Sequence, residues 1–233
     1  MKRRLALLTA LVCAAFAGCE SRGAPDATRA ARSTPGARTP EQQTSWAAQI
    51  ELVERGKATA IVVEDEPLDD DDLAQLEQLE RLTELSLRKA AVSDRGLQRL
   101  GGLTRLEKLV LGETSVTDEG LEALSRLAQL RILNFESAAV TSAGFCRLTA
   151  LDELELVRFG KSQIDDAGLA CVEKWPKLRS LILQNAPITD AGLEMLKGLK
   201  RLESLYLEGT DVTEAGLAAL QQALPELHIH PHP

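Results

Sequence analysis

The 233-residue sequence predicts an α/β solenoid, in which parallel strands line a concave face and short helices cover the convex face. Two observations carry this prediction. Glycines recur at a constant step, from position 96 to 120 to 144 and on to 216, and leucines keep the same step on both sides of them. Each unit also combines an alternating apolar pattern, typical of a strand, with an apolar spacing typical of a helix. One such unit cannot bury its apolar side alone, so neighbouring units must stack.

Residues 1–18 are expected to be a signal peptide. A basic start, "MKRR", precedes "LALLTALVCAAFA", an apolar run too short to span a bilayer comfortably. The next residues, "FAGC", resemble a bacterial lipobox, and this resemblance implies lipidation of Cys19 at the mature N-terminus. Phe16 departs from the leucine usual in that motif, and cleavage after Ala17 into a soluble periplasmic or secreted form is the alternative. Both interpretations predict export. The lipobox resemblance implies that an Asp directly after the cysteine would retain the protein in the inner membrane. Glu20 stands there instead, which favours the outer membrane.

Residues 19–43 are expected to form a flexible tether, because they are rich in Ala, Arg, Ser, Thr, Pro and Gly and lack apolar periodicity. Such a stretch cannot bury enough surface to offset its ordering entropy. Residues 44–57 then predict a helix that ends near Gly56. We expect this helix to cap the exposed end of the repeats. Its apolar face consists of Trp46, Ile50 and Val53.

The repeat domain is expected over residues 58–230, as seven units of equal length followed by a shortened terminal strand. The first unit is weaker and carries Asp72 where the others carry glycine. The stretch "LDELELVRFG" at 151–160 allows two frames, and we choose the frame without insertions because the glycines on both sides then keep their step. This frame puts Leu154, Val157 and Phe159 in core positions. The six glycines are Gly96, Gly120, Gly144, Gly168, Gly192 and Gly216.

The stretch "VTDEGLEAL" at 116–124 represents the joint between loop and helix in each unit. Its threonine suits a helix N-cap, the following acid favours a helix start, and the glycine allows close packing against the neighbouring coil. Because the cluster recurs once per unit, we interpret it as a structural part and not as a catalytic site. The predicted N-caps are Ser93, Thr117, Thr141, Asp165, Thr189 and Thr213.

The complete pattern, "LxxLxLxxTxVTDxGLxxLxxL", resembles the leucine-rich repeats of many exported bacterial proteins. It is also similar to the repeat half of eukaryotic F-box substrate receptors, but we expect a signal peptide and not an F-box segment before the repeats. The resemblance implies a solenoid whose concave face binds a partner. It does not name that partner, since the fold hosts many binding roles.

The strand residues between the leucines are expected on the concave face, where core packing does not require them to be apolar. Five of them nevertheless form an apolar run that we expect to be exposed, with a polar rim, as in protein-contact surfaces. Tyr206, the single tyrosine, is the best candidate for an anchor. The predicted protein-binding residues are Val110, Ile132, Asn134, Leu156, Arg158, Ile182, Gln184 and Tyr206.

Two clusters could suggest a metal, although we expect none to be bound. His228 and His230 alternate along the terminal strand and would share its concave side, but no cysteine or clearly placed carboxylate completes a ligand set. The run "DDDD" at 69–72 lacks the glycine and the spacing of a calcium loop, so we interpret it as a helix cap with first-turn acids.

Cys146 and Cys171 fall in adjacent units, one helical position apart in phase. Export permits a disulfide. Packed helix axes lie about 8–10 Å apart, however, and a bridge needs Cα atoms within about 7 Å. We therefore expect two small unbonded residues packed between helices, with a disulfide as the alternative.

The net charge of −8 argues against nucleic acid as a partner. No serine, cysteine or lysine has a histidine at a plausible triad phase, and no glycine-rich phosphate loop is present. These features predict a monomeric, non-enzymatic module without a cofactor, which binds a protein or peptide and touches the membrane only through its lipid. A structural envelope protein without a discrete ligand, and a sensor that binds metal at His228 and His230, are the alternatives.

Overall fold

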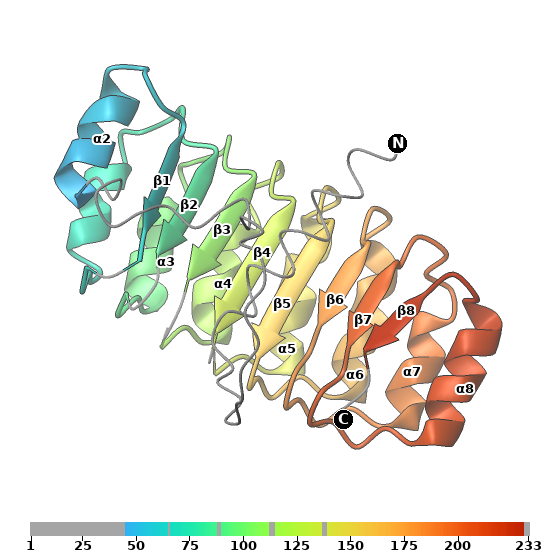
Figure 1. Ribbon diagram of the computed structural model, residues 1–233. Helices are drawn as coiled ribbons and strands as arrows, with labels where there is room; N and C mark the ends of the chain where they lie inside the picture. The colour runs from blue at the N-terminus through green and yellow to red at the C-terminus, as the bar shows by residue number, and fades with distance from the viewer. Residues whose placement is uncertain (1–44, 65, 88–89, 112–114, 137–138, 231–233) are drawn as a thin grey trace, which may run out of the picture. The chain divides into compact units, whose positions relative to one another are not determined.

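The computed structural model describes residues 45–64, 66–87, 90–111, 115–136 and 139–230. The predicted signal peptide, Cys19 and the predicted tether lie outside these residues. The described part forms one sheet of eight parallel strands in chain order, with helices on one face of the sheet (Figure 1). The α/β solenoid predicted from the sequence is thereby confirmed. The strands are β1 (Ala60–Val63), β2 (Glu84–Leu87), β3 (Lys108–Leu111), β4 (Ile132–Glu136), β5 (Leu156–Gly160), β6 (Ser180–Ile182), β7 (Ser204–Tyr206) and β8 (His228–His230).

Each strand pairs with the next at the step of the sequence repeat, as Leu85 with Leu109 shows. The chosen frame of the fifth strand is confirmed, because Val157 pairs with Leu133 and Phe159 with Phe135. The α-helices are α2 (Trp46–Glu54), α3 (Asp94–Leu100), α4 (Asp118–Leu124), α5 (Ser142–Phe145), α6 (Asp166–Leu169), α7 (Asp190–Leu196) and α8 (Glu214–Ala223). Within the described residues, three 3₁₀ segments accompany them: η2 (Asp72–Leu76), η3 (Cys146–Ala150) and η4 (Ala170–Lys174). Among the described helices, none is long and apolar enough to cross a membrane.

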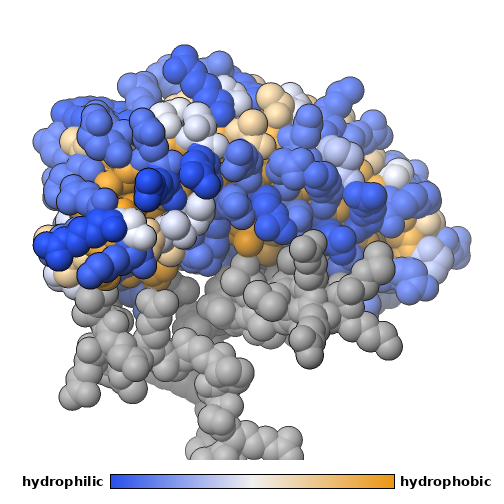
Figure 2. All heavy atoms as spheres, turned by 90° about the horizontal axis from the view of Figure 1, so that it is seen from above, coloured by the Kyte–Doolittle hydropathy of each residue, from blue (hydrophilic) through white to orange (hydrophobic). Residues whose placement is uncertain are grey.

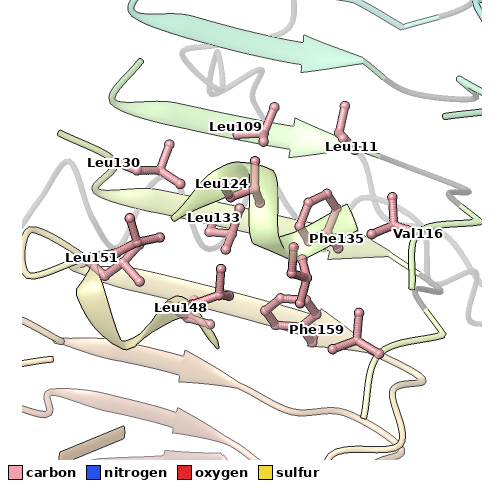
Figure 3. Packing of buried hydrophobic residues seen from close by; sticks show 14 of the residues in the cluster. Leu109, Leu111, Val116, Leu124, Leu130, Leu133, Phe135, Leu148, Leu151 and Phe159 are labelled. Atoms are coloured by element: carbon pink, nitrogen blue, oxygen red, sulfur yellow. The ribbon is translucent and has the colours of Figure 1, made fainter. Parts of the chain in front are cut away.

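The core lies between the sheet and the helices, where the repeated leucines are buried. In the middle of the array aromatic residues replace leucines, and Phe135 and Phe159 pack with ring centroids 5.5 Å apart (Figure 3). Phe145 meets the ring of Trp175 edge-on, and the Trp175 indole N–H donates to the carbonyl of Leu148 at 3.0 Å. A tryptophan is therefore accommodated in this core with its polar group satisfied.

The helix α2 covers the free edge of β1. The side-chain amide of Gln49 donates to the carbonyl of Val62 and accepts from its N–H, both at 2.8 Å. Gln49 thus acts as a short substitute strand at an edge that would otherwise be open to another chain. Gly56 ends the helix at a φ of +66° as predicted, with the two backbone bonds of a Schellman motif.

All six predicted N-caps are confirmed, because each of their side chains accepts a hydrogen bond from an amide in the first helical turn. The acid after the cap reaches further than the sequence suggests. Asp118 accepts from the N–H of Thr141 at 2.8 Å and from its hydroxyl at 2.6 Å, one unit along the chain. Asp70, Asp94, Asp166 and Asp190 bind the caps of their following units in the same way. We call this series of contacts the carboxylate ladder.

The prediction for the cysteines was wrong, since Cys146 and Cys171 form a disulfide with Cα atoms 5.4 Å apart. The distance between packed helix axes is larger than the distance between facing Cα atoms, so it was the wrong measure for a bridge. In these two units the helix is a single turn of four residues, and the chain continues as a 3₁₀ segment. The cysteines lie near the starts of η3 and η4. Because Cα atoms lie about 2.3 Å from a helix axis, facing Cα atoms of neighbouring units come closer together than the axes, and the axis spacing did not exclude a bridge.

Candidate functional site

The residues between the core leucines project from the sheet on the side opposite the helices, because side chains alternate along a strand. We call this surface the strand face. Its two central columns are set by the strand register and cross all eight strands. One column contains Ala60, Glu84, Lys108, Ile132, Leu156, Ser180, Ser204 and His228. The other contains Val62, Ser86, Val110, Asn134, Arg158, Ile182, Tyr206 and His230.

The structure brings seven of the eight predicted binding residues to these columns, and Gln184 lies just beyond β6. Val110, Ile132 and Tyr206 are half-buried. The centre of the predicted apolar band is not exposed, however, since Leu156 is 5% and Ile182 is 1% exposed although neither belongs to the core cluster. Ile182 lies in register between Arg158 and Tyr206, two long side chains that flank it. The sequence pattern placed these residues on the correct face but did not predict their burial.

A polar chain runs along the carboxyl ends of β5, β6 and β7. Arg158 donates to the amide oxygen of Gln184 at 3.3 Å, and the Gln184 amide donates to Glu208 at 2.8 Å. These contacts join side chains of three neighbouring units. They give the strand face a polar border next to its apolar residues.

A second polar border lies where the strands begin, and its charges alternate in sign from one unit to the next. Arg131 lies between Glu107 and Glu155, at 3.6 and 2.8 Å, and the hydrogen bond to Glu155 is the main cause that raises the pKa of Arg131. Arg179 pairs with Glu203 further along. Seen from above, the described surface is mostly hydrophilic with apolar patches between the polar side chains (Figure 2).

Two side chains on the strand face hold buried oxygen atoms without a hydrogen-bond partner in the described chain. They are the side-chain carbonyl of Asn134, which is 7% exposed, and the hydroxyl of Ser180, which is 1% exposed. Buried polar atoms usually have a partner, so such exceptions need an explanation. The sequence signal for them was only that polar residues stand at positions flanked by apolar ones.

The terminal histidines lie on the last strand of the sheet. The His230 ring stacks on Tyr206 at 4.0 Å, and burial, followed by the nearby His228, lowers the pKa of His230. Nδ1 of His228 lies 3.3 Å from the carbonyl oxygen of Glu203. Within the described residues, no group of three or more His, Cys, Asp or Glu side chains is arranged to hold a metal ion.

The four aspartates at 69–72 have structural contacts. The carboxylate of Asp69 accepts from the amides of Asp71 and Asp72, at 2.8 and 3.3 Å. Asp70 begins the carboxylate ladder at Ser93, and Asp71 pairs with Arg95 at 2.7 Å. The predicted cap is confirmed in part: Asp69 caps the turn that leads into η2 and Asp72 lies in the first turn, whereas Asp71 at the N-cap itself makes no side-chain capping bond.

Comparison with known proteins agrees with this architecture. The leucine-rich repeat family profile matches residues 103–125 and 176–197. An internalin from Listeria monocytogenes has a similar structure, with a TM-score of 0.62 and 22% identity over 77% of this chain and 49% of its own. Internalin C2 from the same organism gives a TM-score of 0.59 and 22% identity over 77% of this chain and 74% of its own.

A leucine-rich repeat protein from Leptospira interrogans is also similar, with a TM-score of 0.56 and 17% identity over 78% of this chain and 50% of its own. The chain thus spans about half the length of the first and the third of these proteins. No curated protein sequence matches it. At these identities the likeness concerns the fold, which is a leucine-rich repeat solenoid.

Proposed function

We propose that this leucine-rich repeat chain is a non-enzymatic module that binds a protein or peptide through its strand face. One observation carries the proposal: the register of the parallel strands sets apolar and polar side chains in two continuous columns between two polar borders. A mixed apolar and polar patch with a polar rim is the usual composition of a protein-binding surface. Tyr206 is half-buried in this patch and is the proposed anchor.

The proposal extends to location, where the support comes from the sequence. The basic start, the apolar run and "FAGC" support export and a lipid on Cys19 of a bacterial envelope protein. Residues 19–43 would then act as a flexible tether to the membrane. A Cys19→Ser variant is expected to leave the membrane fraction, and mass spectrometry of the mature N-terminal fragment is expected to show the lipid mass. An unmodified Cys19 would contradict the anchor but not the binding face.

Binding can be tested with a phage-displayed library of random twelve-residue peptides, screened against the full chain. For the selected peptides, Tyr206→Asp and Ile132→Asp are each expected to weaken affinity at least about 30-fold, as for anchor residues of a contact surface. Met195→Asp is the matched control, because Met195 is a 42% exposed apolar residue on α7, on the helix face. Wild-type affinity in the two strand-face variants, or a loss confined to Met195→Asp, would contradict the assigned face.

A further inference from the structure

We propose that Asn134 and Ser180 are main-chain anchors for an extended peptide that crosses β4, β5 and β6 and is uncharged over that stretch. This inference rests on the proposed function and names the kind of partner that the strand face takes. It begins from the buried oxygen atoms of these two residues, which have no hydrogen-bond partner in the described chain. Burial without a partner destabilises the free protein, and a ligand that donates to these oxygens would remove that cost.

The register fixes where the two anchors lie. Asn134 on β4 is paired with Arg158 on β5, and Ser180 on β6 is paired with Leu156 on β5. The anchors are therefore two strands apart, roughly 10 Å across the sheet, and two residues apart along the strand direction, roughly 7 Å, which places them roughly 12 Å from each other. About three to four extended residues span the same distance. One peptide can thus meet both anchors while it lies across the strands.

The chemistry of the anchors fits a peptide main chain. A side-chain amide offers one acceptor and one donor group, which match the N–H and C=O of a peptide unit. The protein already contains this pairing, since Gln49 binds both backbone groups of Val62 at 2.8 Å. The Ser180 hydroxyl can likewise accept from a main-chain N–H.

The neighbours of the anchors favour an uncharged peptide over a charged polymer or a glycan. Six residues form the two columns on β4, β5 and β6, and Arg158 is the one with a formal charge. The other neighbours, Ile132, Leu156 and Ile182, are aliphatic. Sugar rings bind best against aromatic faces, and the ring of Tyr206 is already stacked on His230. Near β4, β5 and β6, other charged residues stand at the border of the strand face, as Arg131, Glu155 and Arg179 do.

The test uses the tightest peptide from the random library and a set of versions with one backbone N-methyl group each. Asn134→Ala and Ser180→Ala are each expected to weaken binding of the parent peptide about 3- to 10-fold, the usual effect of one lost hydrogen bond. One N-methylated peptide should bind wild type more weakly than the parent peptide does, by a similar factor. The same methyl group should change the affinity for Asn134→Ala very little. Ser204→Ala is the matched control, because Ser204 follows Ser180 in the same column one strand along.

Thermal unfolding separates an anchor from a structural residue. Removing an oxygen that has no partner should leave the melting temperature unchanged or raise it, and Asn134→Leu provides a second variant that fills the same space. Wild-type affinity in Asn134→Ala and Ser180→Ala, combined with a loss in Tyr206→Asp, would overturn the anchors and leave the proposed function standing. Failure of every library peptide to bind would overturn both. Selective loss of glycan binding in Asn134→Ala would replace the peptide by a glycan.

Discussion

Each coil of the array is held to the next by a device of three residues. In its central example, Asp118 accepts two hydrogen bonds from Thr141, and its carboxylate fills the space where a side chain on Gly144 would lie. The glycine is therefore needed because of the acid of the preceding unit. The threonine closes the same contact and also caps its own helix. The acid, the hydroxyl and the glycine recur once per repeat unit because each such contact joins one unit to the next.

A Gly144→Ala substitution is expected to lower the free energy of unfolding by about 2–3 kcal/mol, as overpacking of a rigid site does. The added Cβ would lie 2.1 Å from Oδ1 of Asp118 and 2.7 Å from its Cα, so a rotamer change cannot relieve the clash. Urea unfolding measures the effect. Gly198→Ala is the control, because a Cβ added there would meet no atom within 4 Å, and its effect should stay within about 0.5 kcal/mol. Equal effects of the two substitutions on the free energy of unfolding would contradict the claim that Gly144 is required by its contact with Asp118.

In the contact between Ser142 and Asp165 the acid and the hydroxyl have exchanged places, and the hydrogen bond is kept. Ser142 stands where the other units have the acid, and Asp165 stands where they have the hydroxyl, so Ser142 donates to the Asp165 carboxylate at 2.5 Å. Ser142→Asp would put two carboxylates together and should lower the free energy of unfolding by about 1–2 kcal/mol at pH 7. Adding Asp165→Thr restores the pattern of the other joints and should recover most of that loss, which a double-mutant cycle measures.

The pH dependence of the same pair gives a check with a definite sign. The hydrogen bond from Ser142 is the main cause that lowers the pKa of Asp165 below 3.8. The contact therefore stabilises the fold above that pH, and its contribution is lost as the pH falls through the lower folded pKa. The difference between wild type and Ser142→Asp should shrink below about pH 4, where carboxylates become protonated. A difference that stays constant far into the acid range would contradict the charge argument.

At the scale of elements, the fourth and fifth units depart from the others together. Their α-helices have four residues each, whereas α3, α4 and α7 have seven. The same two units contribute the phenylalanines of the aromatic cluster and the disulfide. Larger core side chains and a covalent link thus accompany the loss of regular helix in the middle of the array.

The disulfide is expected to stabilise the domain by about 3 kcal/mol, because it links residues separated by 25 positions and so closes a loop in the unfolded chain. Urea unfolding of wild type should therefore show lower stability with dithiothreitol than without it. The Cys146→Ser/Cys171→Ser variant should match reduced wild type and should not respond to the reductant. Equal stability of oxidised and reduced wild type would contradict a structural role for the bridge.

The elements that repeat could be predicted from the sequence, as could the capping helix α2 from its apolar face. Contacts that occur once could not be predicted. Leucines and caps in fixed phase predicted the strands, the helix starts and the frame around Val157. Gln49 offered no such signal, because its partner Val62 belongs to another element. The disulfide was missed because the distance between helix axes was compared with the limit for Cα atoms, which lie off those axes. The ladder could have been found, since hydroxyl and acid exchange places together at Ser142 and Asp165.

The strand face shows the same limit. Alternation along the strands placed Asn134 and Ile182 on the correct side of the sheet. It could not predict that Ile182 is 1% exposed, or that the Asn134 oxygen is buried without a partner in the described chain. Both properties depend on the way in which side chains of neighbouring strands cover the face. No single repeat unit contains that information.

At the scale of the whole repeat domain, stability is expected to be uneven along the array, because each coil contacts mainly its neighbours. The middle coils hold fully buried aromatic rings and the disulfide. In α8 one residue, Leu220, is buried. Leu217 of α8, Val212 before it and Ile229 of β8 are only partly buried. We therefore expect amide hydrogen exchange to be fastest in β8 and β7 and slowest in β4 and β5, with reduction of the disulfide speeding exchange mainly in the middle. Uniform exchange across all eight strands would show that the domain unfolds as one cooperative unit, and that the joints between coils are stronger than the differences among them.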